Sequence, residues 1–589
     1  MPLRRIMRLA PWPLRRRILA ALRLWVLPRM AADRRLRAAC HWVPLAPAPI
    51  RCGRTRQDDT ASPASVRRQN VDRVVTALDA AGIDWFRVPA KSFTHTAVAV
   101  PDTERTRVAA LLKELTATDN GLLEPAQDRV LRVSWPVTDS RKHLALGAEY
   151  GCEVEFWQER DGTLVGPRSN PVADVIPADE PIVTVAEPVL SEFASPHDTT
   201  RYRTREVFTL GGPDRVTFPI DVVYTWVDGS DPAWLERKAR ALAENAWITG
   251  VNGQAANNSR FASRDELRYS MRALHYYAPW VRRIFLVTDD QVPAWLDTEH
   301  PQVTVVSHQE VFGDTGRLPT FNSQAIESRL HRIDGLAEHF LYLNDDVFLA
   351  RPVPPTMFFT PGGLTRFFPS TALVDSAPRS PADPPVNSAG KNNRRLIQEA
   401  FGRVLTRKML HTPHPSRRTV ITEIERRFAE HVTATAGHQF RHPDDISLLS
   451  SLQQYYAYLT GRAAPGEIEY MYTDLADPDT PFRLARLLRD RHMDAFCLND
   501  TDSHPDAVAE QAALLADFLP AFLPFAAPFE LAQPRETTSS DGAENPDADL
   551  ITVPHIPITR GAPAATDRVP TQGERAKARP SFKENTLEL

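Results

Sequence analysis

The sequence has little cysteine, no long apolar run and almost no net charge. The four cysteines among 589 residues are Cys40, Cys52, Cys152 and Cys497. Their spacing shows no paired metal-ligand pattern, which indicates free thiols in a reducing compartment. No run of about 18 uncharged apolar residues is present, so no membrane-spanning helix is expected. The net charge of −4 argues against nucleic acid as a partner.

Two phosphate-binding motifs are also absent. No G-x-x-x-x-G-K-[ST] occurs, and no G-x-G-x-x-G follows an apolar strand. A P-loop enzyme and a dinucleotide-binding enzyme therefore both lose support.

Residues 1–65 form a basic amphipathic leader followed by a linker rich in proline and arginine. Arginine interrupts every apolar run of the leader, so a cleaved secretory signal is not favoured. Two interpretations stay open. The leader is either an in-plane contact with an anionic membrane or a solvated or domain-packed helix.

The segments on either side of the main domain are interpreted from composition and periodicity. Residues 66–200 predict a small accessory α+β unit, because "NVDRVVTALDAAGIDWFRVP" is typical of a helix, a glycine turn and a strand. "HTAVAVPDTERTRVAALLKEL" predicts a strand, a turn and a second helix. Residues 530–589 are polar and proline-rich, which predicts a mostly disordered tail.

Residues 218–515 predict an α/β catalytic domain with a helical C-terminal part. The expected strands are "FPIDVVYTWVD", "RRIFLVTDD", "QVTVVSH" and "HFLYLNDD". The expected helices include "SRDELRYSMRALHYYAPW", with a capping box from Ser263 to Glu266, "NSQAIESRLHRI", "DDISLLSSLQQYYAYLTG" and a short turn at "VPAWL". Continuous apolar strands alternating with helices indicate a mostly parallel sheet flanked by helices.

Carboxylates follow three of the expected strands. Asp228 ends the first, Asp289 and Asp290 end the second, and Asp345 and Asp346 end a later one. Ligands of open α/β sheets bind outside the carboxyl ends of the strands, so we expect these acids to face one crevice. A carboxylate pair after Asn344 suits Mg²⁺ or Mn²⁺. The alternative is an acidic turn without a metal.

Basic residues and histidines gather further along the chain. His411 and His414 precede Arg417 and Arg418 in "HTPHPSRR". Arg441 and Asp445 stand in "FRHPDDIS", and Lys391 stands in "GKNNRRL". Histidine moves protons near neutral pH, and arginine holds phosphate oxygens in a fork. The combination indicates an enzyme that handles a phosphorylated substrate with a divalent cation; a zinc site at the histidine pair lacks further ligands at suitable spacing.

Four blocks of the sequence, in order, resemble those of the Stealth proteins. These blocks are "IDVVYTWVDGSDPAW"; "SRDELRYSMRALHYYAPWVRRIFLVTDDQVPAWL" through "LPTFNSQAIESRLHRIDGLAEHFLYLNDDVFL"; "HTPHPSRRTVITEIERRF" through "FRHPDDIS"; and "FCLND". They span about residues 220–500, half of the chain. Stealth proteins are sugar-1-phosphate transferases that include bacterial capsule polymerases and the catalytic chain of the animal lysosomal-enzyme GlcNAc-1-phosphotransferase.

The resemblance implies a nucleotide-sugar-binding fold, a nucleotide-diphosphate sugar donor and a polysaccharide or lipid-linked glycan acceptor. Sugar-1-phosphate moves to the acceptor hydroxyl, nucleoside monophosphate leaves and a phosphodiester forms. The implied metal ligands are Asp346 and Asn499. The implied catalytic residues are His411 as general base, Arg441 facing the phosphoryl group, Asp345 beside the metal, and Asp445 holding Arg441 or His411.

The resemblance also implies a set of substrate-binding residues: Asp228, Glu266, Arg268 and Asn344. The basic runs described above add Lys391 and Arg418 as candidate substrate-binding residues. Asp228 departs from the family pattern, since related animal proteins carry an amide there. Two other functions stay open: a metal-dependent glycosyltransferase that releases nucleoside diphosphate, and a non-catalytic assembly factor. The expected location is cytoplasmic, with contact at the inner face of the plasma membrane.

Overall fold

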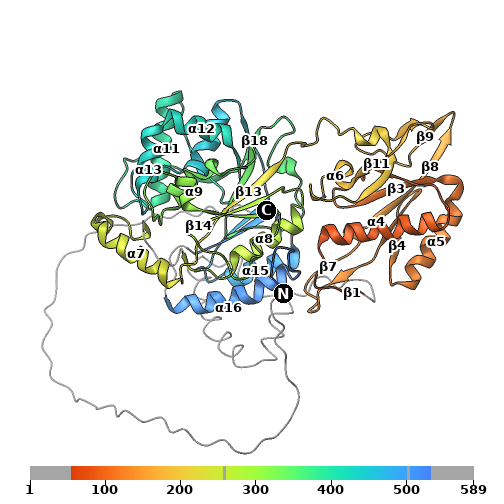
Figure 1. Cartoon of the computed structure of the whole chain (residues 1–589), viewed down its shortest axis with the longest axis horizontal. Helices are drawn as coiled ribbons and strands as arrows, with labels where there is room; N and C mark the ends of the chain where they lie inside the picture. The colour runs from red at the N-terminus through yellow and green to blue at the C-terminus, as the bar shows by residue number, and fades with distance from the viewer. Residues whose placement is uncertain (1–54, 256–260, 501–504, 532–589) are drawn as a thin grey trace, which may run out of the picture. The chain divides into compact units, whose positions relative to one another are not determined.

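The computed structural model describes residues 55–255, 261–500 and 505–531 (Figure 1). Residues 1–54 of the expected leader and linker (1–65) and residues 532–589 of the expected tail (530–589) lie outside these residues. No helix within the described ranges is both long enough and apolar enough to cross a membrane.

A five-stranded sheet organises the catalytic domain. Its order is β15-β14-β13-β16-β21, and the first four strands are parallel while β21 is antiparallel to β16. The strands are β13 Ile220–Thr225, β14 Ile284–Thr288, β15 Val303–Ser307, β16 His339–Asn344 and β21 His414–Arg417. The predicted mostly parallel α/β sheet is confirmed.

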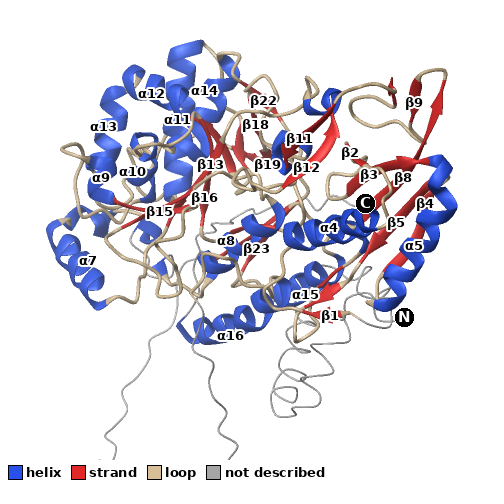
Figure 2. Ribbon diagram, turned by 45° about the vertical axis from the view of Figure 1, so that its right-hand side comes forward, coloured by secondary structure: helices blue, strands red, loops and turns tan. Residues whose placement is uncertain are grey.

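Helices cover both faces of this sheet (Figure 2). Alternate residues of β13 enter different cores: Val222 and Tyr224 pack with α8, and Val223 packs with the core that includes α12 and α14. The helices of the domain are α7 Pro232–Glu244, α8 Glu266–Tyr277, α9 His308–Phe312, α10 Ser323–Glu327, α11 Pro385–Phe401, α12 Arg418–Arg427, α13 Ala429–Gly437, α14 Gln453–Leu459, α15 Thr480–Asp490 and α16 Pro505–Phe522. Burial on both faces explains why the strands are apolar throughout.

A second, three-stranded sheet begins directly after β16. Its order is β17-β24-β23, with β17 Val347–Leu349, β24 Ala495–Asn499 and β23 Tyr470–Asp474. Two short pairs join the surrounding loops: β18 Thr365–Phe367 with β22 Ala463–Pro465, and β19 Pro369–Leu373 with β20 Arg407–Met409. Asp345 and Asp346 therefore occupy the turn between two sheets.

The N-terminal part has its own sheet and its own apolar clusters. Helices α4 Pro63–Ala80 and α5 Arg105–Thr118 confirm the two predicted helices, and β2 and β3 confirm the predicted strands. The sheet comprises β2 Phe86–Val88, β3 Thr96–Pro101, β4 Leu122–Gln127, β5 Val130–Ser134, β8 Cys152–Arg160, β9 Thr163–Val165, β10 Val175–Pro177, β11 Ile182–Ala186 and β12 Arg201–Arg205. A smaller sheet joins β1 Arg56–Gln57, β6 Val137–Thr138 and β7 Ala145–Leu146.

Two local predictions were wrong, whereas "VPAWL" forms a turn, in which the Leu296 amide donates to the Pro293 carbonyl oxygen at 3.0 Å. No capping box forms at Ser263, because α8 begins at Glu266 behind Asp265 in the left-handed conformation. "NSQAIESRLHRI" contains only the short α10 and a 3-10 turn at Leu330–Arg332, and the break falls at Ser328, whose hydroxyl binds the carbonyl oxygen of Ala325.

Glu187 is the buried ionic centre of the N-terminal part. Its carboxylate binds Arg67 at 2.6 Å and Arg87 at 2.7 Å, and all three side chains are almost fully buried. Burial alone would raise the pKa of Glu187, but the two guanidinium groups outweigh burial and lower that pKa to about 2. The ion pairs therefore stabilise the fold at pH values above the ordinary pKa of glutamate. This stabilisation is lost as the pH falls toward 2.

We predict that Glu187→Ala lowers the free energy of unfolding at neutral pH by about 3–5 kcal/mol, because two buried arginines lose their counter-charge. The same change should flatten the loss of stability between neutral pH and acid. Calorimetric melting of the full chain across pH measures both effects. Glu124→Ala, at an exposed position of the same sheet, is the control; equal melting curves for both variants would contradict the prediction.

Candidate functional site

The acids that follow β13, β14 and β16 lie at one edge of the sheet, because these strands are parallel and in register. Their environments differ. The carboxylate of Asp228 accepts hydrogen bonds from the amide and hydroxyl of Ser230, so it shapes its own turn. Asp289 pairs with Arg237 at 2.8 Å. These two acids have local partners, whereas the turn after β16 brings carboxylates together.

The Asp345 carboxyl group lies among other carboxylates. Burial, followed by the negative charges of Asp346 and Glu266, raises the pKa of Asp345 well above its usual value. Burial also raises the pKa of Glu266, with Asp346 contributing in the same direction. Arg264 lies 3.7 Å from Glu266 but pairs more closely with Asp500, at 2.6 Å. The geometry concentrates negative charge at one turn, where a cation would relieve the repulsion.

His411 reaches this turn because β21 is antiparallel to β16. Tyr342 pairs with His414 in the register of the two strands, so the loop before β21 passes the carboxyl end of β16. His411 Nε2 consequently lies 3.1 Å from Asp346 Oδ1. The His411 side chain is 32% exposed and that of Asp346 is 20% exposed, so substrate has access to both.

Cys497 contacts the other oxygen of Asp346. Its Sγ donates to Asp346 Oδ2 at 3.3 Å, and the donor atoms of Asp346, His411 and Cys497 lie within 4.8 Å of one another. Burial and then Asp346 raise the pKa of Cys497, so the thiol keeps its proton near neutral pH. The sequence predicted a free thiol and did not predict this contact; the pairing of β24 with β17 explains it.

The same pairing brings Asn499 to the turn. Val347 pairs with Cys497, and the Leu498 amide donates to the Asp346 carbonyl oxygen at 3.0 Å. Continuing this antiparallel register by two residues places Asn499 opposite Asp345. Two segments about 150 residues apart thus meet at one point.

Arg441 lies on the other side of His411. Its Nη2 donates to Ser323 Oγ at 2.7 Å. Burial lowers the pKa of Arg441, and the charge of Glu327 opposes that shift. Glu327 is itself buried and interacts electrostatically with both Arg441 and His411. The sequence analysis missed Glu327, because nothing in its local pattern distinguishes it from an ordinary helical glutamate.

Asn344 donates to the Tyr342 hydroxyl at 3.3 Å.

Asp445 binds other partners than those predicted. Its buried carboxylate accepts hydrogen bonds from Asn322 Nδ2 at 2.7 Å, His438 Nδ1 at 2.7 Å and the His442 amide at 2.8 Å. It therefore fixes the loop that carries Arg441 and does not hydrogen-bond to Arg441 or His411. The helix predicted from Asp444 onward begins only at Leu448, because Asp445 is engaged in this turn.

Three of the predicted substrate-binding residues have partners of their own in the structure. Arg418 follows β21 and lies near Glu338 at the amino end of β16, about 20 Å along the strand from Asp345. Lys391 pairs with Asp383 and Asp375. Arg268 donates to Glu530, on a different face of α8 from Glu266.

Asp445→Asn should destabilise the protein by about 1–3 kcal/mol, because an amide cannot accept from all three donors and one buried donor loses its partner. Thermal unfolding of the full chain measures this loss. The neighbouring Asp444→Asn is the matched control, since the side chain of Asp444 is 50% exposed. A stable Asp445→Asn protein that has lost activity would contradict the positioning role and restore a direct catalytic one.

Comparisons with known proteins identify the family. Family models of the four Stealth conserved regions match residues 218–246, 260–367, 410–458 and 485–540. An exopolysaccharide phosphotransferase of Streptomyces coelicolor is 47% identical over 80% of this chain and 83% of its own length. A second from that organism is 44% identical, over 80% and 85%. The exopolysaccharide phosphotransferase CpsY of Mycobacterium tuberculosis is 36% identical, over 73% and 80%. The chain belongs to the Stealth protein family.

Proposed function

We propose that this chain is an exopolysaccharide phosphotransferase that moves sugar-1-phosphate from a nucleotide-diphosphate sugar to an acceptor hydroxyl. The observation that carries the proposal is the 3.1 Å contact between His411 and Asp346, which joins a candidate base to a carboxylate cluster. These two residues lie in the third and second conserved regions, respectively. Positioning and charge stabilisation supply most of what phosphoryl transfer requires.

The carboxylate turn fits a divalent cation. Three carboxylates converge there, and the pKa of Asp345 is raised well above its usual value by burial and by this crowding. The pairing of β24 with β17 brings the end of β24, which carries Asn499, toward this turn. Asp346 and Asn499 would hold Mg²⁺ or Mn²⁺, with Asp345 and Glu266 beside it. A bound cation would neutralise the diphosphate of the donor and stabilise charge on the transferred group.

The remaining residues provide the proton acceptor and a second positive charge. In the tautomer with hydrogen on Nε2, His411 donates to Asp346 and accepts the proton of the acceptor hydroxyl at Nδ1. The acceptor oxygen then bonds to the sugar-proximal phosphorus while the bond from that phosphorus to the nucleotide oxygen breaks. Arg441 faces the transferred phosphoryl group, and nucleoside monophosphate leaves.

The acceptor we propose is a polysaccharide or a lipid-linked glycan, and the donor is a nucleotide sugar. We place the enzyme in the cytoplasm, with peripheral contact at the inner face of the plasma membrane. Support for that contact comes from the basic leader, whose arginines suit an anionic lipid surface.

Acceptor-dependent release of nucleoside monophosphate is the expected result when purified protein is incubated with Mn²⁺ or Mg²⁺, UDP-, GDP- and CDP-sugars, and a cell-envelope acceptor. Ion-exchange chromatography identifies the nucleotide. His411→Ala should lower this release by about 10²–10⁴-fold, because the hydroxyl loses its base. The control is His431→Ala, on α13. Release of nucleoside diphosphate would instead identify a glycosyltransferase and refute the proposal.

Asp346→Asn should abolish both turnover and tight Mn²⁺ binding, because an uncharged amide replaces the carboxylate expected to ligate the metal. Electron paramagnetic resonance of free Mn²⁺, measured without substrate, gives the binding readout. Asp314→Asn, at an exposed position, is the control. Unchanged Mn²⁺ affinity or substantial turnover in Asp346→Asn would remove Asp346 from the metal site.

A further inference from the structure

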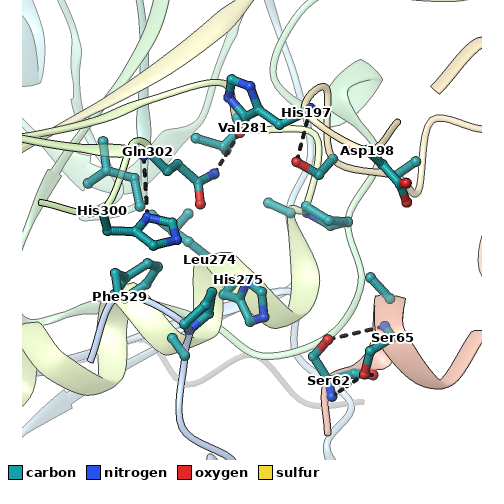
Figure 3. Close-up of a pocket in the computed structure, with 18 of the residues that line it drawn as sticks. Ser62, Ser65, His197, Asp198, Leu274, His275, Val281, His300, Gln302 and Phe529 are labelled. Atoms are coloured by element: carbon teal, nitrogen blue, oxygen red, sulfur yellow. Dashed lines mark hydrogen bonds between the residues drawn. The ribbon is translucent and has the colours of Figure 1, made fainter. Parts of the chain in front are cut away.

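A cavity of about 900 Å³ opens between the N-terminal part and the catalytic domain (Figure 3). Its walls come from the start of α4, the second half of α8 and the segment 526–531. Of the residues predicted to form the catalytic site, it includes only Arg268. The volume lies in the range of small-molecule sites, so the cavity is large enough for a ligand.

Two charge clusters reach the wall, one through Arg67 and Glu187 and the other through Arg268 and Glu530, and each also contains a second arginine that does not line the cavity. Glu187 forms ion pairs with both Arg67 and Arg87, and Glu530 forms ion pairs with both Arg268 and Arg272. In each cluster one carboxylate compensates two guanidinium groups. Each cluster therefore has a net charge of one positive unit, which an anionic ligand would neutralise.

Two arginines on opposite sides of the domain junction have hydrogen-bonding capacity for that anion. Arg268, on α8, donates through Nε to Glu530 at 2.6 Å, and its two terminal nitrogens have no hydrogen-bond partner within the described residues. Arg68, on α4, lies 3.8 Å from Asp198, which is too far for a hydrogen bond, and its side chain is 46% exposed. Terminal guanidinium nitrogens are the donors that hold phosphate in a fork.

His275 adds a neutral donor at the centre of the cavity (Figure 3). Within the described residues it makes no hydrogen bond. Burial lowers its pKa to about 4, so the ring is uncharged at neutral pH and carries one N–H. Its ring lies edge-on to that of Phe529, with centroids 6.3 Å apart.

The rest of the lining is mainly apolar. Phe193, Leu274, Ala278, Val281 and Phe529 all contribute to the wall. A bare inorganic ion would leave this surface uncovered, whereas a ligand with an apolar or aromatic body would bury it.

We propose that the cavity binds a small organic phosphate, with the phosphate between Arg68 and Arg268 and the apolar or aromatic body against Leu274 and Phe529. A nucleoside monophosphate and a short prenyl phosphate share this chemistry. The site does not depend on the reaction proposed above. It gives the N-terminal part a role as one half of a binding site.

The test is isothermal titration of the full chain with UMP, AMP, farnesyl phosphate, farnesol and inorganic phosphate, all in EDTA. We expect at least one organic phosphate to bind, and inorganic phosphate and farnesol each to bind at least about tenfold more weakly, since each lacks half of the recognised chemistry. The organic phosphate that binds best identifies the source. Equal affinity for inorganic phosphate, or no binding by any probe, would overturn the proposal.

Arg68→Gln and Arg268→Gln should each weaken binding of the organic phosphate by about tenfold or more, since each removes charge-assisted hydrogen bonds. Arg68→Gln is the safer variant for folding, because Arg68 is exposed, and Arg105→Gln on α5 is its matched control. Binding that persists unchanged in both variants would overturn the proposal. Nucleotide release at the catalytic site is assayed separately, so failure of one result leaves the other intact.

Discussion

Repulsion among carboxylates at the turn after β16 is the constraint on which the rest of the site depends. Asp345, Asp346 and Glu266 converge there, and the pKa of Asp345 is raised far above its ordinary value by burial and by its neighbours. A fold maintains such crowding at a cost to its stability. The surrounding elements are arranged so that two other segments approach this turn, one with His411 and the other, β24, with Cys497 and Asn499. This is the geometry expected where a cation and a phosphorylated substrate meet the protein.

The antiparallel direction of β21 determines which residues of the 411–418 segment lie near the carboxylate turn. Because β21 runs against β16, the residue that precedes it meets the carboxyl end of the sheet and the residue that follows it meets the amino end. His411 and Arg418 are only seven positions apart in the sequence, yet the strand separates them by its whole length. One end of this motif therefore lies at the carboxylate turn, and the other end lies at the opposite end of the sheet.

The sequence predicted those features of the structure that depend on the local pattern of residues. Apolar strands such as "IDVVYT" and the acids that follow them identified the sheet and its functional edge. The resemblance brought together Asp346, His411 and Asn499 as candidates, and strand pairing shows that these segments meet. Cys497 and Glu327 were missed, and the ion pairs of Lys391 with Asp383 and of Arg268 with Glu530 were not foreseen, because side-chain partners from other segments determine each of these contacts. Local propensity contains no information about such partners.

Helix α8 contributes residues both to the carboxylate turn and to the wall of the cavity. Glu266 and Arg268 are two residues apart, which corresponds to about 200° around a helix, so they face opposite directions. Glu266 meets the carboxylate turn, while Arg268 meets Glu530 and the cavity at the domain junction. Glu530 also binds Arg272, one helical turn further on, and so fixes the orientation of the helix. A displacement of the segment that carries Glu530 would rotate or shift α8, and with it the acid that approaches Asp345. The cavity therefore borders the same helix that contributes Glu266 to the carboxylate cluster.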